Sequence, residues 1–170
     1  MRYERTRAAA LLAGAGFGGL LDGILLQQIG QWHHTVSARL SPVTIDALQL
    51  NLLADGLFNL ILWILVIAGL LMLYSTLRGS GPVPSLRAFA GYLLIGWGAF
   101  NLAEGALDHH VFDLHHVRDL PNHLPTYDWV YLVLAGIGFI VIGLAIRDGK
   151  SRAPAPAIER RSGRERRLAY

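Results

Sequence analysis

Four apolar stretches constrain the fold of this chain more than any other feature. They run from about residue 8 to 30, 45 to 73, 86 to 107 and 129 to 146. A hydrocarbon core about 30 Å thick needs about 20 apolar residues in a helix. A buried soluble bundle is the alternative, but its helices would show a charged face at every turn, and charged residues make up only 16% of this chain. The sequence therefore predicts an all-α, integral membrane four-helix bundle.

The lysines and arginines predict how these helices are oriented. Of the 15 lysines and arginines, only Arg39 and Arg118 fall in the connections after the first and third stretches. The others lie on the opposite side, which the positive-inside rule places in the cytoplasm. We therefore expect a multi-pass protein of the inner, cytoplasmic membrane with both termini in the cytoplasm. The net charge of +3 then reflects orientation, and we expect no nucleic-acid partner.

An internal repeat becomes visible when the sequence is aligned with itself so that residue 22 falls on residue 104. Each half, residues 8–75 and 86–147, is then one helical hairpin, and the two hairpins point the same way about an axis along the membrane normal. Accidental alignment is the alternative, but three ionisable pairings share the register. We expect residues 1–147 to form the transmembrane domain and residues 148–170 a disordered basic cytoplasmic tail. This repeat alignment pairs Asp22 with Glu104, His33-His34 with His115-His116, Asp46 with Asp128, Gly14 with Gly96, and Gly56 with Gly138.

The repeated acid and histidine positions predict a shared polar centre. On an uninterrupted helix, Asp22 and His33 would share one face and lie about 16 Å apart along the axis. The same spacing joins Glu104 to His115. The twofold axis would then gather two acids, two histidine pairs and the acids at the outer helix starts around one outward-facing cup. Adjacent histidines diverge by about 100° on a helix, so we expect only one of each pair to point to the centre.

A second polar set lies within the apolar stretches. Asn51, Asp55 and Asn59 recur every four residues on one helix face, and Asn101 precedes Glu104 by three. We expect Asp55 near the middle of the bilayer, where an ionisable group costs several kcal/mol unless it is paired or hydrated. Such residues suggest function, but hydrogen bonds that join helices are the alternative.

All seven histidines fall in the outward loops or at the helix ends that lead into them, and the chain has no cysteine. Imidazole and carboxylate ligands without sulfur suit copper(II), iron(II) or zinc, so we predict a mononuclear or dinuclear metal site. Histidines hydrated at the lipid headgroups or titrating with pH are one alternative. Bis-histidine haem is another, although it needs two facing histidines well inside a bundle. The candidate ligands are His33, His115, Asp22, Glu104, His109 and Asp108, followed by His34, His110, His116 and His123.

The chain also resembles a known family. The resemblance is carried by residues 16–23 (GFGGLLDG), 31–34 (QWHH), 101–105 (NLAEG), 108–110 (DHH) and 115–116 (HH), and extends to about residue 146. These segments are similar to a prokaryotic family of predicted four-span membrane proteins, domain-of-unknown-function family 2243. The resemblance implies membrane location without an assigned activity. Some members resemble neighbours of, or fusions with, a copper-handling assembly factor of haem–copper oxidases, which implies a link to copper or to oxidase assembly.

Three functions therefore stand as hypotheses. The first is a membrane metal-binding protein with its site at the outer face, serving metal handling or respiratory oxidase assembly. The second is a membrane oxidoreductase or hydroxylase with a dinuclear site and a substrate that arrives from the lipid. The third is a proton-coupled transporter with Asp55, Asp22 and Glu104 as a relay. The expected partners are the lipid bilayer, oxidase assembly factors and further copies of the chain.

Overall fold

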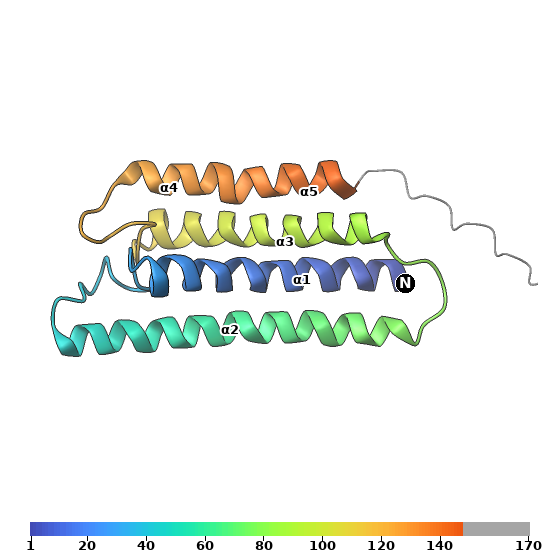
Figure 1. The fold of residues 1–170 in the computed structure, drawn as a ribbon, viewed down its shortest axis with the longest axis horizontal. Helices are drawn as coiled ribbons and strands as arrows, with labels where there is room; N and C mark the ends of the chain where they lie inside the picture. Colours follow the sequence, from blue (N-terminus) through green and yellow to red (C-terminus); the bar gives the residue numbers. More distant parts are fainter. Residues whose placement is uncertain (148–170) are drawn as a thin grey trace, which may run out of the picture.

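The computed structural model describes residues 1–147, in which every regular element is helical (Figure 1). These elements form four rods, as predicted; the tail expected for residues 148–170 lies outside the described residues. The rods are α1 (Arg2–Asp22) with η1 (Gly23–Ile29), α2 (Ile45–Leu77), α3 (Leu86–Ala106) with η2 (Leu107–Val111), and α4 (Pro125–Tyr131) with η3 (Leu132–Gly138) and α5 (Phe139–Arg147). The three η segments are π-helical continuations of their rods.

Three of the four rods are long and apolar enough to cross a membrane: Arg2–Ile29, Ile45–Leu77 and Pro125–Arg147. The rod of α3 and η2, predicted as a fourth span, is not among them. It lies between α1 and α5 and carries the buried polar residues Asn101, Glu104 and His109. The outer helix α2 instead exposes large apolar side chains such as Leu57 and Trp63. The rods therefore place polar groups inside and apolar groups outside, as expected for a protein surrounded by lipid.

The two inner helices, α1 and α3, lie side by side, with α2 against α1 and α5 against α3 (Figure 1). A Cβ atom added at Gly14 would strike the carbonyl oxygen of Leu93, and one added at Gly96 would strike that of Leu11. The repeat alignment pairs Gly14 with Gly96 and Leu11 with Leu93. The inner pair therefore packs backbone against backbone at a crossing that follows the predicted repeat.

The outer helices follow a different register from the inner ones. A Cβ atom at Gly69 in α2 would press on Ala13, whereas one at Gly143 in α5 would press on Ile95, which is the counterpart of Ala13 in the repeat. The outer helices therefore match Gly69 with Gly143, at a smaller offset than the inner helices. The predicted pairing of Gly56 with Gly138 is wrong. The reason is that α2 extends beyond α4 at the loop end (Figure 1), so the two outer helices begin at different heights.

Both inner helices end in the same way. The N–H group of Gly30 donates to the carbonyl of Leu25 at the end of η1, and that of Phe112 donates to Leu107 at the end of η2 (2.8 and 2.7 Å). Gln31 and Asp113, which are counterparts in the repeat, then adopt the left-handed conformation with φ of 50° and 52°. A left-handed residue cannot continue a right-handed helix, so the chain turns back towards the bundle in both halves.

These reversals place both histidine-bearing connections at one end of the bundle. The N-terminus, the connection from α2 to α3 and the end of α5 all lie at the opposite end (Figure 1). The basic and histidine-rich segments are therefore separated by the length of the rods.

Candidate metal centre

Two histidines, one from each connection, form the middle of the candidate site. The rings of His33 and His115 stack with their centroids 4.5 Å apart and their planes 20° apart. The Nδ1–H group of His33 donates to the carbonyl oxygen of Val117 (3.0 Å), and that of His115 donates to the carbonyl of Thr35 (3.1 Å). A carbonyl only accepts hydrogen bonds, so it fixes the proton on Nδ1 and leaves Nε2 facing the cluster, as in many metal-binding histidines.

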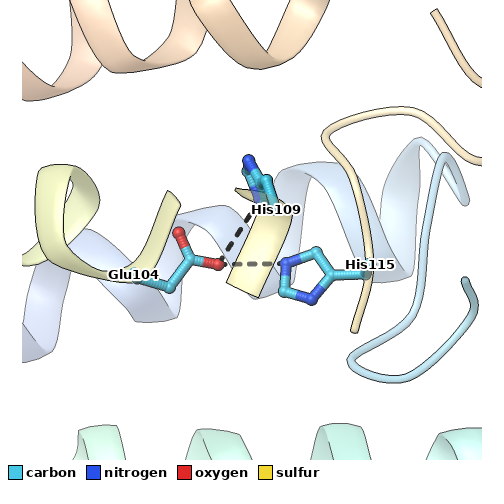
Figure 2. A group of neighbouring side chains, drawn as sticks. All are labelled: Glu104, His109 and His115. Carbon is cyan, nitrogen blue, oxygen red and sulfur yellow. Dashed lines mark hydrogen bonds and ion pairs between the residues drawn. The ribbon is translucent and has the colours of Figure 1, made fainter. Parts of the chain in front are cut away.

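One oxygen of Glu104 faces two imidazoles, those of His109 and His115 (Figure 2). This atom, Oε1, is 3.0 Å from His115 Nε2 and 3.7 Å from His109 Nε2. All three side chains are buried, and one ligand atom from each lies within 4.8 Å of the others. Two ligands bound 2.0 Å from a tetrahedral metal ion would be about 3.3 Å apart. The two separations from Glu104 bracket this value, and the two imidazole ligand atoms lie within 4.8 Å of each other, so the group would have to close around a metal ion.

Several buried polar atoms around this group have no hydrogen-bond partner. They are His33 Nε2, His109 Nδ1, Glu104 Oε2 and the hydroxyl group of Tyr131. Buried polar atoms are nearly always hydrogen-bonded, because an unpaired one carries its full desolvation cost. These four atoms come from two rods and a loop, and nitrogen and oxygen donors of this kind suit a transition metal ion.

Asp22 is the counterpart of Glu104 in the first half. Its Oδ2 atom lies 3.5 Å from His33 Nε2. The predicted pairing of acid with histidine is therefore present, but the separation of about 16 Å expected for an uninterrupted helix is wrong. The chain reverses after η1 and brings His33 back to the acid.

The electrostatics of the cluster favour a charged His115 before a metal binds. Burial by itself lowers the pKa of His115. The hydrogen bond to Glu104 and the negative charges of Glu104, Asp22 and Asp108 outweigh it and raise the pKa to about 9, from an ordinary value of 6.5. A metal ion that bound at Nε2 would therefore have to displace a proton at neutral pH.

A second group of candidate ligands adjoins the first on the loop side. Ligand atoms of His116, His123 and Asp128 lie within 4.8 Å of one another, and His123 Nε2 donates to Asp128 Oδ2 (3.0 Å). The two histidine rings stack at 3.7 Å. His109 joins the groups, because its Nδ1 atom is 3.6 Å from Asp128 Oδ1 and its Nε2 atom faces Glu104. The arrangement suits either one metal ion or two.

Two carboxylates accept hydrogen bonds from backbone N–H groups of the histidine-bearing loops. Asp55 Oδ1 accepts the N–H group of Thr35 (2.7 Å), and Asp128 Oδ1 accepts that of Val117 (2.8 Å). These loop residues are repeat counterparts, so Asp55 rather than Asp46 is the structural partner of Asp128. Asp46 is exposed, and its predicted place in the cup is wrong. Asp55 takes the place predicted for Asp46 because α2 extends further than α4 at the loop end of the bundle.

The remaining candidates lie around this centre. Asp55 Oδ2 accepts a hydrogen bond from His34 Nδ1 (2.6 Å), so both oxygens of Asp55 bind the histidine-bearing loop. His110 is exposed and packs on Trp129, whereas His109 is buried. The prediction that one histidine of each adjacent pair points to the centre is therefore confirmed for His109-His110. It also holds for His33-His34, because His33 stacks on His115 whereas His34 bonds to Asp55.

The other polar candidates serve as contacts between segments. Asn51 donates to the carbonyls of Leu40 and Ala47, and Asn101 donates to the carbonyl of Ala135. The amide oxygen of Asn59 lies against Gly23. Asp108 is half-buried near the cluster and lies outside both metal-binding groups. The interpretation that these residues join helices by hydrogen bonds therefore fits Asn101, which joins α3 to η3.

A comparison with protein families identifies the chain at the level of family. The model of the DUF2243 family, described as predicted membrane protein, matches residues 9–150. The chain belongs to this family. No curated protein and no solved structure matches it.

Tyr131 of this DUF2243 member lies at the site although the sequence did not predict it, and Gln27 is a further buried polar residue, in η1. Tyr131 presents its unpartnered hydroxyl group to the cluster, and Gln27 is 2% exposed with neither amide atom hydrogen-bonded. Gln27 was detectable, because the repeat alignment pairs it with His109. Tyr131 gave no such signal, since its position depends on the register of the outer helices.

Proposed function

We propose that the protein is an integral membrane metal-binding protein in which Glu104, His109 and His115 hold a transition metal ion. The observation that carries the proposal is the convergence of two imidazoles and one carboxylate within 4.8 Å, all buried. The unpartnered atoms around them support it. The donor set suits iron(II), zinc or copper(II).

The remaining residues of the cluster orient these ligands. The carbonyls of Thr35 and Val117 fix the Nδ1 protons of His115 and His33. Asp128 lies within reach of His109 Nδ1 and connects the second group of ligands. Such outer contacts commonly change metal affinity about 10- to 100-fold. A bound ion would supply Lewis-acid or redox chemistry at this position.

The position of the site supports a role at the outer face of a membrane. The histidine loops lie at the end of the rods opposite Arg78, Arg87 and Arg147, and under the positive-inside rule this arrangement supports loops outside the cytoplasm. A metal ion would reach His123, which is exposed, before the buried group. We propose metal handling as the role, with respiratory oxidase assembly factors as partners of the kind that the family resemblance suggests.

Metal analysis of the purified protein tests the proposal. Protein reconstituted with iron(II), zinc or copper(II) and washed is expected to retain at least one ion per chain. His115→Ala is expected to lose it. His110→Ala is the matched control, because His110 is exposed outside both groups, and it is expected to retain the ion. A wild-type protein that retains no stoichiometric metal, or equal retention by both variants, would overturn the proposal.

A membrane oxidoreductase is the second candidate. Its supporting observation is that two histidines and one carboxylate leave coordination positions open, an arrangement typical of iron(II) oxygenases. Oxygen consumption by iron-loaded protein supplied with membrane lipid extract tests this role. Consumption that disappears in His115→Ala supports it, and no consumption above that of the metal-free protein contradicts it.

A further inference from the structure

A cavity of about 160 Å³ lies next to the metal centre, between the inner helices and the fourth rod. Asp22 lines both the cavity and the metal centre. The rest of the lining is mainly apolar and aromatic, with contributions from Gly18, Trp97 and Phe139. The cavity is therefore an apolar space that ends at the polar cluster.

The corresponding groove in the other half of the molecule is filled. Phe100 is the repeat counterpart of Gly18, and Phe58 corresponds to Tyr131 in the register that pairs Asp55 with Asp128. The rings of Phe58 and Phe100 pack against each other, 6.2 Å apart. A glycine and a tyrosine therefore open one groove where two phenylalanines fill the other. A Cβ atom added at Gly18 would strike the ring of Trp97, so the opening depends on this glycine.

The inner end of the cavity presents polar atoms that lack partners. Asn101, which is 3% exposed, and Tyr131 both line the cavity. The amide oxygen of Asn101 and the hydroxyl group of Tyr131 have no partner at hydrogen-bond geometry, and the Tyr131 hydroxyl also lies near the carboxylates of Asp22 and Glu104. The amide oxygen only accepts hydrogen bonds, whereas a hydroxyl both donates and accepts. A ligand with one hydroxyl group at this end would satisfy both.

The outer end of the cavity opens towards lipid. Leu21 and Leu25 line it and are 38% and 47% exposed on the outside of the rod Arg2–Ile29, which is one of the candidate membrane spans. A molecule dissolved in the bilayer can therefore enter between the rods without crossing the histidine loops.

We propose that this cavity binds a phenolic ring whose apolar substituent remains in the lipid. An apolar cavity of about 150 Å³ accommodates one benzene molecule, which matches the volume observed here. Trp97 and Phe139, packed edge to face at 5.1 Å, provide aromatic walls for such a ring. Its hydroxyl group meets Asn101 and Tyr131. The inference goes beyond metal binding, because none of these contacts requires a metal ion.

Binding of tritiated 4-nonylphenol to metal-free protein in nanodiscs tests the proposal, with empty nanodiscs subtracted. We expect saturable binding of one molecule per chain. The competitor 4-nonylanisole has the same ring and tail but cannot donate a hydrogen bond, and it is expected to compete at least tenfold more weakly. Uptake that rises linearly without saturation, or equal competition by the two compounds, would show that any lipid-like chain fills the cavity and would overturn the proposal.

Two variants locate the binding. Gly18→Phe reproduces Phe100 of the filled groove and is expected to weaken 4-nonylphenol binding at least tenfold. Gly56→Phe is the matched control, because nothing lies within 4 Å of a Cβ atom at Gly56. Tyr131→Phe keeps the ring and is expected to weaken 4-nonylphenol severalfold, because it removes the hydroxyl group that donates to the phenol oxygen.

The outcomes separate this proposal from metal binding. Unchanged 4-nonylphenol affinity in Gly18→Phe would overturn the cavity assignment. Should that variant fail to fold, Tyr131→Phe decides the matter, because unchanged affinity there removes the polar end of the site. Metal content is measured on the same variants. A wild-type protein that retained no metal ion but still bound 4-nonylphenol would count against the proposed metal centre and not against the cavity.

Discussion

The two halves of the molecule use the same positions for different side chains. Asp22 and His33 of the first half correspond to Glu104 and His115 of the second, but Gln27 stands where the second half has a histidine, His109. Gln27 is buried with both amide atoms unpaired. The difference teaches that the repeat builds a symmetric frame, whereas the ligand set that fits a metal ion comes from the second half alone.

The largest expected effect comes from converting the second half into the first at one position. His109→Gln copies Gln27 and removes one imidazole from the ligand group, so we expect metal affinity to fall at least about 100-fold. His33→Ala removes a histidine outside the three-ligand group and is expected to cost about tenfold. Competition titration with a chromogenic chelator measures both. An equal loss in the two variants would mean that the halves share the ion.

The carboxylates beneath the loops offer the next comparison. Asp55→Ala and Asp128→Ala each leave a loop N–H group without its acceptor, those of Thr35 and Val117. We expect each to lower the free energy of unfolding by about 2–3 kcal/mol, measured by unfolding in mixed SDS micelles. Asp128→Ala is expected to lower metal affinity more than Asp55→Ala, because Asp128 lies beside the ligand His109, whereas Asp55 acts on His115 only through Thr35. An equal or larger metal defect in Asp55→Ala would contradict this assignment.

At His115, metal affinity and the stability of the metal-free protein are expected to depend on pH in opposite directions. Its pKa of about 9 lies above the ordinary 6.5, so the ring is protonated at pH 7 and must lose that proton to bind metal. Affinity is expected to rise about tenfold per pH unit up to about pH 9. The stability of the metal-free protein should instead fall as the pH rises. Stability from the charged pair with Glu104 is complete below pH 6.5 and is lost as pH rises to about 9.

Repeating the chelator titration between pH 6 and 9 measures the first effect, and thermal unfolding of the metal-free protein measures the second. His110→Ala is the control and should show the same slopes as the wild type, because His110 is exposed outside both groups. Affinity that does not change with pH would contradict the raised pKa of His115.

The sequence predicted much of this arrangement. Apolar length located four rods, although only three of them are long and apolar enough to cross a bilayer. The repeat correctly paired Asp22 with Glu104 and His33 with His115, because the inner helices cross with the same register in both halves. The divergence of neighbouring side chains on a helix predicted that His109 and His110 would separate.

The sequence did not predict how the outer helices pair. Asp46 matches Asp128 in the repeat alignment, but helix packing places Asp55 there, because α2 extends further than α4 at the loop end. Nor did helical periodicity reveal that Gln31 and Asp113 reverse the chain. That reversal, rather than a continuous helix, is what brings His33 within 3.5 Å of Asp22. Both errors concern tertiary geometry, which one-dimensional spacing does not contain.

The smallest expected effect tests the register of the outer helices directly. Gly56 and Gly69 lie in the same helix, α2, but nothing surrounds a Cβ atom at Gly56, whereas one at Gly69 would press on Ala13 at 2.9 Å. Gly56→Ala is therefore expected to stabilise the protein by about 0.5–1 kcal/mol, because alanine favours a helix over glycine. Gly69→Ala is expected to destabilise it by about 1–3 kcal/mol, because the added methyl group separates α1 from α2. Unfolding in mixed SDS micelles measures both changes. If the two signs were reversed, α2 would contact α1 through Gly56, and the repeat alignment of the inner helices would describe the outer helices after all.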